Sequence, residues 1–268
     1  MKILKTPWKN ELLQLVHESK RSVKITSPFV KYNICSEVLK AKRRGTKFEI
    51  ITSFKLMSVY SGSLDLNALD IILKRNGVVK NYSKLHAKMY LFDEERAIVT
   101  SGNLTYAGLV KNFEYGLFVD DYNIVSAIAD DYQALSHHEN TSRVKLSDVQ
   151  TARIMIEKIA KTKSVTFPTF QLETETEVPD VIETDIQPIA SSLSGWRLDV
   201  FTCLNQISKE IFFLSDVYKF ESLLKSKHQN NKHVKDKIRQ QLQGLKAIGL
   251  IEFLGSGKYR KLWKQAER

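Results

Sequence analysis

The first 125 residues alternate between two apolar periodicities, and this alternation limits the fold more than any other feature of the chain. Apolar residues have helical spacing at residues 12–16, 37–44 and 64–74. Strand-like runs are found at residues 22–26, 48–52, 85–92, 96–101 and 113–119. Helices that alternate with strands are typical of layered α/β proteins. The sequence therefore predicts an α/β domain with a mixed central sheet, in which Asn76-Gly77 ends the third helix.

The remaining residues divide into three parts. Two longer helical patterns follow the strands, at residues 122–137 and 146–159. Within residues 161–190, threonines are interleaved with glutamates at 173–177 and 183–184, and prolines at 168, 179 and 188 interrupt any periodicity, which is typical of an extended linker. Helical spacing resumes at Trp196. We therefore expect one domain over residues 1–160, an acidic linker over 161–190 and a second domain over 191–268.

The net charge of +11 is unevenly distributed. Residues 1–160 contain 24 Lys and Arg against 17 Asp and Glu, a net charge of +7. Residues 161–190 contain 2 against 6, and residues 191–268 contain 15 against 7, which gives −4 and +8. Positive charge concentrated in the last third of a chain is typical of a nucleic-acid-binding module.

The composition also indicates a compartment. No window approaches the roughly 18 apolar residues that a membrane-spanning helix needs, and the first residues contain no apolar run of signal-peptide length. The two cysteines, Cys35 and Cys203, lie in different expected domains and are better explained as reduced thiols than as a disulfide. We therefore expect a cytoplasmic protein with no membrane partner.

Polar side chains suited to binding phosphate recur along two neighbouring strand patterns. His86 and Lys88 are two residues apart, so they share one face of the strand expected at residues 85–92. Ser101 and Asn103 share a face of the next strand by the same period. A hairpin through residues 93–96 brings the two strands together, so an imidazole, an ammonium, a hydroxyl and an amide are expected to converge.

This pattern resembles the signature of a known superfamily. The run His86-x-Lys88-x4-Asp93-x6-Thr100-Ser101-Gly102-Asn103 is similar to the phospholipase D signature H-x-K-x4-D-x6-G-S-x-N. It departs from the signature at Thr100, where the superfamily usually has the Gly that tolerates positive φ. Glu114 stands eleven residues after Asn103, where single-motif bacterial nucleases of the superfamily also have a Glu.

The resemblance implies a role for each residue of the motif. An imidazole is partly neutral near neutral pH and can attack phosphorus through one ring nitrogen, so His86 is the expected nucleophile that forms a phosphohistidine. Lys88 and Asn103 are expected to stabilise charge on the phosphoryl group, and Ser101 to bind or orient the phosphate. Glu114 is expected to orient the imidazole and tune its charge. Fixed cations replace Mg²⁺ in this scheme, so neither a metal nor a cofactor is expected.

One part of the motif and one other histidine cluster are not assigned to catalysis. Asp93 is expected to have a structural role in the hairpin. His137-His138-Glu139 is not a second copy of the motif, because no Lys follows at the right spacing. It is also a weak metal site, because adjacent residues at a helix end rarely converge. Since the family mechanism uses two motifs, the resemblance implies a homodimer in which both motifs meet across a two-fold axis.

The C-terminal region has the pattern of a helix-turn-helix. A first helix starts near Trp196, and Asp216 is expected to cap a second. A turn at residues 227–231 precedes a third helix at 234–248, whose apolar residues form one stripe: Val234, Ile238, Leu242 and Leu245. A strand at residues 250–254, a turn at 255–257 and a returning strand at 258–263 complete a β-wing.

The stretch from Trp196 to Arg260 resembles the C-terminal winged helix of dam-replacing and Dpn-type methyl-directed restriction enzymes. The resemblance implies that double-stranded DNA is the partner. The third helix is expected to contact DNA through Lys232, His233, Lys235, Arg239 and Gln240. The returning strand is expected to bind phosphates through Lys258, Arg260 and Lys261.

Together the resemblances predict a phospholipase D-like layered domain with a C-terminal winged-helix domain. The implied enzyme is a metal-independent, sequence-specific, type II-like restriction endonuclease that hydrolyses DNA phosphodiesters. Whether recognition depends on methylation is left open. The alternatives are a non-specific nuclease, a phospholipid phosphodiesterase, and a DNA-binding regulator whose phospholipase D-like domain only dimerises it. The basic C-terminal module disfavours a lipid substrate, and the complete polar motif disfavours a non-catalytic domain.

Overall fold

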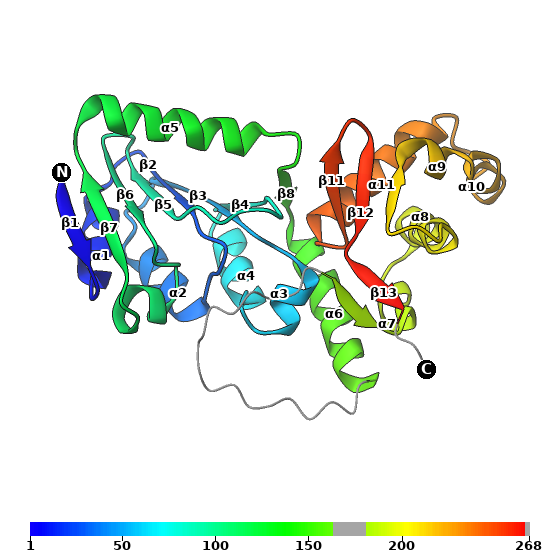
Figure 1. Ribbon diagram of the computed structural model, residues 1–268, viewed down its shortest axis with the longest axis horizontal. Coiled ribbons are helices and arrows are strands. Elements are labelled where there is room, and N and C mark those ends of the chain that lie inside the picture. The colour runs from blue at the N-terminus through cyan, green and yellow to red at the C-terminus, as the bar shows by residue number, and fades with distance from the viewer. Residues whose placement is uncertain (163–180, 266–268) are drawn as a thin grey trace. The chain divides into compact units, whose positions relative to one another are not determined.

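The computed structural model describes residues 1–162 and 181–265, which belong to two compact units (Figure 1). The first unit comprises residues 1–54 and 61–146. The second comprises residues 55–60, 147–162 and 181–265. Residues 147–160, which the sequence places in the first domain, therefore contact the C-terminal part of the chain more than the N-terminal part. Of the linker expected at residues 161–190, residues 163–180 lie outside the described residues.

Within the described residues, the first unit is built on an eight-stranded sheet with the order β1-β7-β6-β5-β2-β3-β4-β8. β2, β3 and β4 are parallel, and the other neighbouring pairs are antiparallel, which confirms the predicted mixed sheet. The strands are β1 (Lys2–Lys5), β2 (Ser22–Thr26), β3 (Lys47–Thr52), β4 (Val78–Asn81), β5 (Met89–Phe92), β6 (Arg96–Thr100), β7 (Tyr115–Val119) and β8 (Ser142–Val144).

Helices cover both faces of this sheet (Figure 1). α5 lies on one face, where strand residues such as Leu91, Ala97 and Val119 pack against Val125 and Tyr132 of the helix. The alternate strand residues point to the opposite face, on which the other helices lie. The helical segments of this unit are α1 (Lys9–Glu18), α2 (Tyr32–Ala41), α4 (Leu66–Lys74), the π-helical turn η1 (Ala107–Lys111) and α5 (Tyr122–His137).

Some expected element boundaries differ from the structure. The strand predicted at residues 85–92 begins only at Met89, because the preceding residues do not continue the regular ladder. The helix predicted near residues 37–44 is α2, which begins at Tyr32 and ends at Ala41. α4 ends as predicted, with Asn76 at a φ of 60°. The short strands β1, β4 and β8 were not predicted, since three or four residues do not establish a period.

The second unit has the expected helix-turn-helix and wing. Its helices are α3 (Leu56–Tyr60), α6 (Leu146–Thr162, from Ser147 on), α7 (Ile186–Ala190), α8 (Gly195–Gln206), α9 (Leu214–Tyr218), α10 (Glu221–Lys227) and α11 (Val234–Ala247). Its strands are β9 (Ile182–Thr184), β10 (Ile211–Phe213), β11 (Ile251–Gly255), β12 (Lys258–Lys261) and β13 (Trp263–Gln265). β11 and β12 form the wing, which β10 extends to three strands.

Three details of this unit correct the sequence-based expectations. Asp216 is not an N-cap: it lies inside α9, and its carboxylate accepts the N–H of Phe213 at 3.0 Å. The second helix is divided into α9 and α10. Residues 182–190, expected to belong to the linker, form β9 and α7, because β9 pairs in parallel with β13.

A glycine in the middle of α11 makes room for an ion pair. A Cβ on Gly244 would lie 2.6 Å from a guanidinium nitrogen of Arg197 in α8. Arg197 in turn lies 3.2 Å from the buried carboxylate of Asp148 in α6. The conformational cost of a mid-helix glycine, about 0.5–1 kcal/mol, is thus offset by a contact that joins three helices of the second unit. No helix in the described ranges has both the length and the apolar character needed to cross a bilayer.

Candidate active site and nucleic-acid interface

The residues of the predicted motif lie at one end of the eight-stranded sheet. β2 ends at Thr26, which pairs with Met89 at the start of β5. β6 ends at Thr100, which pairs with Gly116 near the start of β7. His86 and Lys88 directly precede β5, and Glu114 directly precedes β7. Ser101 and Asn103 follow the end of β6. The topology therefore gathers them at the same edge, as the hairpin argument predicts.

His86 and Lys88 lie in the extended segment that leads into β5. The carbonyl of Ala87 accepts a hydrogen bond from Thr26 Oγ1 at 3.0 Å, and the carbonyl of Lys88 accepts one from the Thr100 N–H at 3.2 Å. These bonds hold the segment between the ends of β2 and β6. His86 is exposed and Lys88 is buried. The imidazole is therefore accessible to a substrate, while the ammonium lies beneath the surface, where its charge is less screened.

Ser101 and Glu114 are in direct contact. The hydroxyl of Ser101 donates to Glu114 Oε2 and accepts the N–H of Tyr115 at 3.1 Å. Asn112 Nδ2 donates to the other carboxylate oxygen of Glu114 at 3.3 Å. A buried carboxylate is costly unless it accepts hydrogen bonds, and Glu114 accepts one on each oxygen. Glu114 thus orients the hydroxyl of Ser101.

Asn103 is completely buried and is held by the loop after β2. Its Oδ1 accepts from the hydroxyl of Ser27 at 3.2 Å and from the N–H of Phe29 at 3.3 Å. The Ser27 hydroxyl also accepts the N–H of Leu104 at 2.9 Å. Because the amide oxygen accepts both bonds, the orientation of the Asn103 amide is fixed by the loop after β2.

Thr100 stands where the superfamily pattern has Gly, and a glycine on the neighbouring strand makes room for its side chain. Thr100 is in ordinary strand conformation, without positive φ. A Cβ on Gly116, its partner in β7, would lie 2.6 Å from the Cβ of Thr100. The Thr100 hydroxyl donates to the carbonyl of Tyr115 at 3.2 Å and accepts the N–H of Gly102 at 3.1 Å. Thr100 therefore supports the backbone beside Ser101 and does not distort it.

A buried aromatic pair supports the turn between Ser101 and Asn103. The hydroxyl of Tyr90 donates to the carbonyl of Gly102 at 3.0 Å, and Trp8 contacts the Tyr90 ring edge-on with centroids 5.2 Å apart. Trp8 Nε1 also donates to the carbonyl of Gly108 in η1 at 3.1 Å. Tyr90 and Trp8 thus connect the turn to η1, and the close approach of Gly102 and Gly108 requires that neither carries a side chain.

Residues that position the motif were not predicted from the sequence. Ser27 holds Asn103, Asn112 holds Glu114, and the Thr6 hydroxyl accepts the N–H of Glu114 at 2.8 Å. Ser27 directly follows a predicted strand, which is a signal for a site at the edge of a sheet. Thr6 is 108 residues from Glu114, so no local pattern connects them.

Asp93 has the structural role predicted for it. Its carboxylate accepts the backbone N–H groups of Lys20, Arg21 and Ser22, each at 2.7 Å, and so ties the β5–β6 turn to the residues before β2. Burial raises the pKa of the Asp93 carboxyl, but the three hydrogen bonds and the charge of Arg21 together lower it by more than burial raises it. The pKa of this carboxyl therefore lies below its ordinary value. The ionised form therefore stabilises the fold.

We expect Asp93→Asn to lower the free energy of unfolding by about 2 kcal/mol at pH 7, because one amide oxygen replaces two charged acceptors. Asn tolerates the positive φ of 56° at this position. The pKa of Asp93 is lower in the folded state than in the unfolded state. The difference in free energy of unfolding between the wild type and Asp93→Asn is therefore complete above about pH 3.9, the unfolded-state pKa, and is lost as the pH falls through the folded-state pKa. Denaturant unfolding at pH 7 and near pH 3 measures this, and a difference independent of pH would contradict it.

The cluster His137-His138-Glu139 uses its ring nitrogens locally. His137 Nδ1 lies 2.9 Å from the carbonyl of Gln133, and His138 Nδ1 accepts the N–H of Asn140 at 3.0 Å. Among the residues that the structure describes, no group of three His, Cys, Asp or Glu side chains is arranged to hold a metal ion.

The exposed face of α11 presents the predicted DNA-contacting side chains. The apolar stripe of the helix is buried, whereas Lys232, His233, Lys235, Arg239 and Gln240 are exposed. Arg239 pairs with Asp236 at 2.8 Å, and Lys235 lies 3.5 Å from Glu221 and 5.4 Å from the ring centre of Tyr218. Exposed ion pairs contribute about 0–1 kcal/mol, so phosphates and base edges can replace these partners.

The returning strand of the wing contributes fewer cations than predicted. Lys258 and Arg260 are partly exposed, and Arg260 pairs with Glu210 at 2.7 Å. Lys261 is buried: its ammonium donates to the carbonyl of Ile207, and burial lowers its pKa. The expectation that Lys261 binds a DNA phosphate is therefore corrected, because strand alternation turns it inward together with Tyr259.

Comparison with protein families gives two matches along the chain. Residues 12–136 match the family described as "Cardiolipin synthase, PLD-like domain", where PLD stands for phospholipase D. Residues 192–261 match the family described as "Dam-replacing HTH domain", where HTH stands for helix-turn-helix. A stretch of 46 residues is 48% identical to the DISARM protein DrmC of Bacillus paralicheniformis, and it covers 17% of this chain and 19% of that protein. The chain thus matches about a fifth of the length of that relative.

Solved structures with a similar fold include two bacterial proteins. The first is Nuc from Salmonella typhimurium, a phospholipase D family member, at 17% identity and a TM-score of 0.46 over 54% of this chain and 97% of that chain. The second is NucT from Helicobacter pylori, at 20% identity and a TM-score of 0.41 over 49% of this chain and 92% of that chain.

Proposed function

The chain combines a phospholipase D-like domain with a dam-replacing helix-turn-helix domain, and from this premise we propose that it is a sequence-specific, metal-independent DNA endonuclease of the restriction type. The observation that carries the proposal is one end of the eight-stranded sheet, to which neighbouring strands bring the exposed His86 and the buried Lys88, Asn103 and Glu114. The short similarity to the DISARM protein DrmC also supports a restriction-type role. The buried thiols of Cys35 and Cys203 fit a reducing cytoplasm.

The proposed reaction has two displacements at phosphorus. A ring nitrogen of His86 forms a P–N bond with the scissile phosphate while the P–O bond to one deoxyribose breaks, and His86 of the partner subunit protonates the departing oxygen. Water then attacks phosphorus and breaks the P–N bond while His86 of the partner subunit takes up a proton from the water, which restores both histidines. Lys88 and the amide of Asn103 stabilise the negative charge on the non-bridging oxygens in both steps. Glu114 accepts the hydrogen bond of the Ser101 hydroxyl and so holds the turn that carries Asn103, through which Ser101 orients the phosphate.

A homodimer supplies the second histidine. One face of the sheet exposes an apolar row, since Ile3, Leu117 and Val99 are cross-strand neighbours with 59%, 41% and 39% of their surface exposed. They share their face with the residues that α5 covers, and they continue toward the edge that carries the motif. Exposed apolar patches beside a site are typical of interfaces. We propose that this row, called here the apolar row, packs against a second copy of the chain.

We expect Leu117→Glu to convert the dimer into a monomer and to reduce cleavage by about 100-fold, because a charge buried in the interface costs about 3–5 kcal/mol. Analytical ultracentrifugation and a cleavage assay measure both effects. Leu223→Glu makes the same change at an equally exposed leucine in α10 and should alter neither. A Leu117→Glu protein that remains a fully active dimer would rule out this interface.

Sequence recognition is assigned to the exposed face of α11. Arg239→Ala should weaken binding to the cognate site by about 1–3 kcal/mol, because a guanidinium can donate two hydrogen bonds to a guanine edge. Lys225→Ala removes a charge from α10 of the same unit and should change affinity little. Fluorescence anisotropy with labelled duplexes at fixed salt measures both. Unchanged affinity of Arg239→Ala for the cognate site would argue against this docking of α11.

The proposal as a whole is tested by incubating the purified protein with methylated and unmethylated genomic DNA in EDTA and, separately, in Mg²⁺. Cleavage in EDTA into discrete fragments is the expected result, and the dependence of the fragments on methylation shows whether recognition requires it. Smeared products would favour a non-specific nuclease. Cleavage that requires Mg²⁺ would contradict the metal-independent mechanism.

Two other functions are separated by the same preparation. Hydrolysis of phospholipid vesicles without DNA cleavage would favour a phospholipid phosphodiesterase. DNA binding without hydrolysis of either substrate would favour a regulator whose phospholipase D-like domain serves dimerisation. The complete motif and the exposed basic face of α11 favour the nuclease over both.

A further inference from the structure

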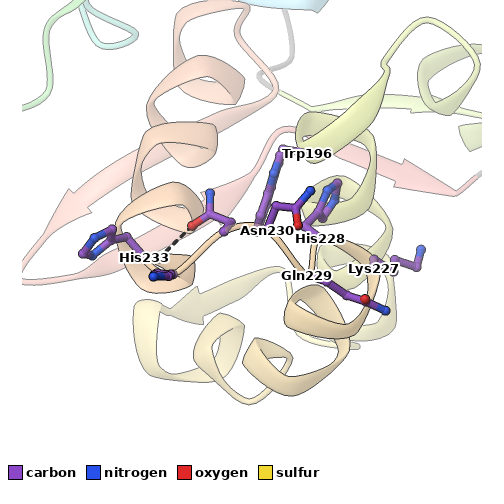
Figure 2. A pocket seen from close by; sticks show the side chains of 8 residues that line it. Trp196, Lys227, His228, Gln229, Asn230 and His233 are labelled. Carbon is purple, nitrogen blue, oxygen red and sulfur yellow. Dashed lines mark hydrogen bonds between the residues drawn. The ribbon is translucent and has the colours of Figure 1, made fainter.

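The second unit contains a pocket of about 820 Å³ between the start of α8 and the turn that precedes α11 (Figure 2). Its volume lies within the range of about 300–1,000 Å³ that is usual for small-ligand sites. Of its lining residues, Lys232 and His233 belong to the DNA contacts proposed above, and none belongs to the hydrolytic motif. Eight residues line it: Trp196, Lys227, His228, Gln229, Asn230, Asn231, Lys232 and His233.

One wall of the pocket is a fixed aromatic pair. The indole of Trp196 stacks on the imidazole of His228 with ring centres 4.0 Å apart and planes 16° from parallel. Asp199, one helical turn after Trp196 in α8, lies 2.8 Å from His228 Nε2 and 2.6 Å from Lys227 Nζ. The carboxylate thus holds both side chains in place, so this wall is organised before any ligand binds.

The lining combines three kinds of chemistry. None of its eight residues carries a carboxylate, while two are lysines and two are histidines. Three are amides, which can both donate to and accept from the edge of a base. Aromatic rings stack on unpaired bases, and lysines attract phosphates. A nucleotide has a flat ring, a hydrogen-bonding edge and a negative charge, and so matches all three.

We propose that this pocket binds one nucleotide of the DNA held by α11, with its base against the Trp196–His228 pair and its phosphate near Lys227 and Lys232. The inference rests on the proposed DNA binding by the second unit and is independent of the hydrolytic step. Bases inside a perfect duplex are stacked and paired, so the pocket takes a base that has left the stack. The protein therefore prefers DNA in which one base is unpaired.

Tryptophan fluorescence reports on this pocket directly. Of the three tryptophans, Trp8 and Trp263 are only 1% and 4% exposed, whereas Trp196 is partly exposed and lines the pocket. Titration of the full-length protein with deoxyadenosine monophosphate should quench this fluorescence, and inorganic phosphate at the same concentration should not. Quenching by phosphate alone to the same extent would show an anion site and overturn the nucleotide assignment.

Affinity for DNA gives the second test. We expect a duplex with one bulged adenine to bind about tenfold more tightly than the same duplex without the bulge, since a base stacked on an aromatic ring adds to the affinity. Trp196→Ala and Asn230→Ala should each reduce this preference, and Asn230 is exposed, so its replacement leaves the fold intact. Lys225→Ala lies outside the pocket and should retain the preference.

The outcomes separate the pocket from the proposed function. Equal binding of both duplexes by the wild type and by Trp196→Ala would leave DNA binding intact and overturn the pocket. Absence of binding to any duplex would overturn both the role of the second unit and this inference. Loss of the preference in the two pocket variants, with binding to perfect duplexes retained, is the result that the structure leads us to expect.

Discussion

Replacement of His86 by alanine should reduce DNA cleavage by at least about 1,000-fold, which corresponds to about 4 kcal/mol of transition-state stabilisation. The effect is large because the proposed mechanism uses this side chain twice: one copy attacks phosphorus, and the copy in the partner subunit protonates the leaving oxygen. His86 is exposed and makes no contribution to the buried core. The variant should therefore fold, dimerise and bind DNA as the wild type does.

Two measurements make this result specific. His137→Ala removes an exposed histidine from the end of α5 and should retain full cleavage. Anisotropy with labelled DNA should show unchanged affinity for His86→Ala, because binding is assigned to the second unit. Cleavage by His86→Ala within tenfold of the wild-type rate would remove His86 from the chemistry, even if the protein proves to be a nuclease.

The second large effect is expected at Gly102, between Ser101 and Asn103. A Cβ there would lie 2.5 Å from the carbonyl oxygen of Gly108 and 3.3 Å from the Trp8 ring. Backbone and a buried indole cannot move as a flexible side chain can, so Gly102→Ala should lower the free energy of unfolding by about 3 kcal/mol. It should also displace Ser101 and Asn103 and reduce cleavage by at least about tenfold in the folded fraction.

Gly62→Ala provides the matched control for the Gly102 result. Gly62 has a φ of 78°, and a Cβ at this position would have no neighbouring atom within 4 Å, so alanine there meets backbone strain but no steric clash. We expect a loss of about 1–2 kcal/mol and unchanged cleavage. Equal losses of stability and activity in the two variants would show that the packing of Gly102 against Gly108 has no particular role.

The sequence predicted those features that depend on local periodicity. Alternation placed β2 and β3 nearly to the residue, and the 3.6-residue period gave α5 its observed limits. The predicted hairpin is present, since β5 and β6 are adjacent antiparallel strands. Glu114 was assigned to the site from the resemblance alone. The stripe of α11 likewise identified which of its residues face outward.

Local periodicity cannot predict contacts between residues that are far apart in the sequence. The bond of Thr6 to Glu114 and that of Ser27 to Asn103 join residues 108 and 76 positions apart, and neither leaves a local pattern. The fold of residues 182–190 depends on pairing with β13, at the other end of the second unit. Lys261 was misjudged from its charge, although its two-residue spacing from the buried Tyr259 indicated an inward side chain.

The phosphohistidine is the central claim, and trapping it is the most direct test. The protein would be mixed with labelled DNA in EDTA, quenched in alkali, in which phosphoramidates survive, and digested for mass spectrometry. The proposed mechanism predicts a DNA-derived phosphate on the peptide that contains His86, absent from His86→Ala. Rapid cleavage by the wild type with no adduct at any quench time, or an adduct on another residue, would contradict it.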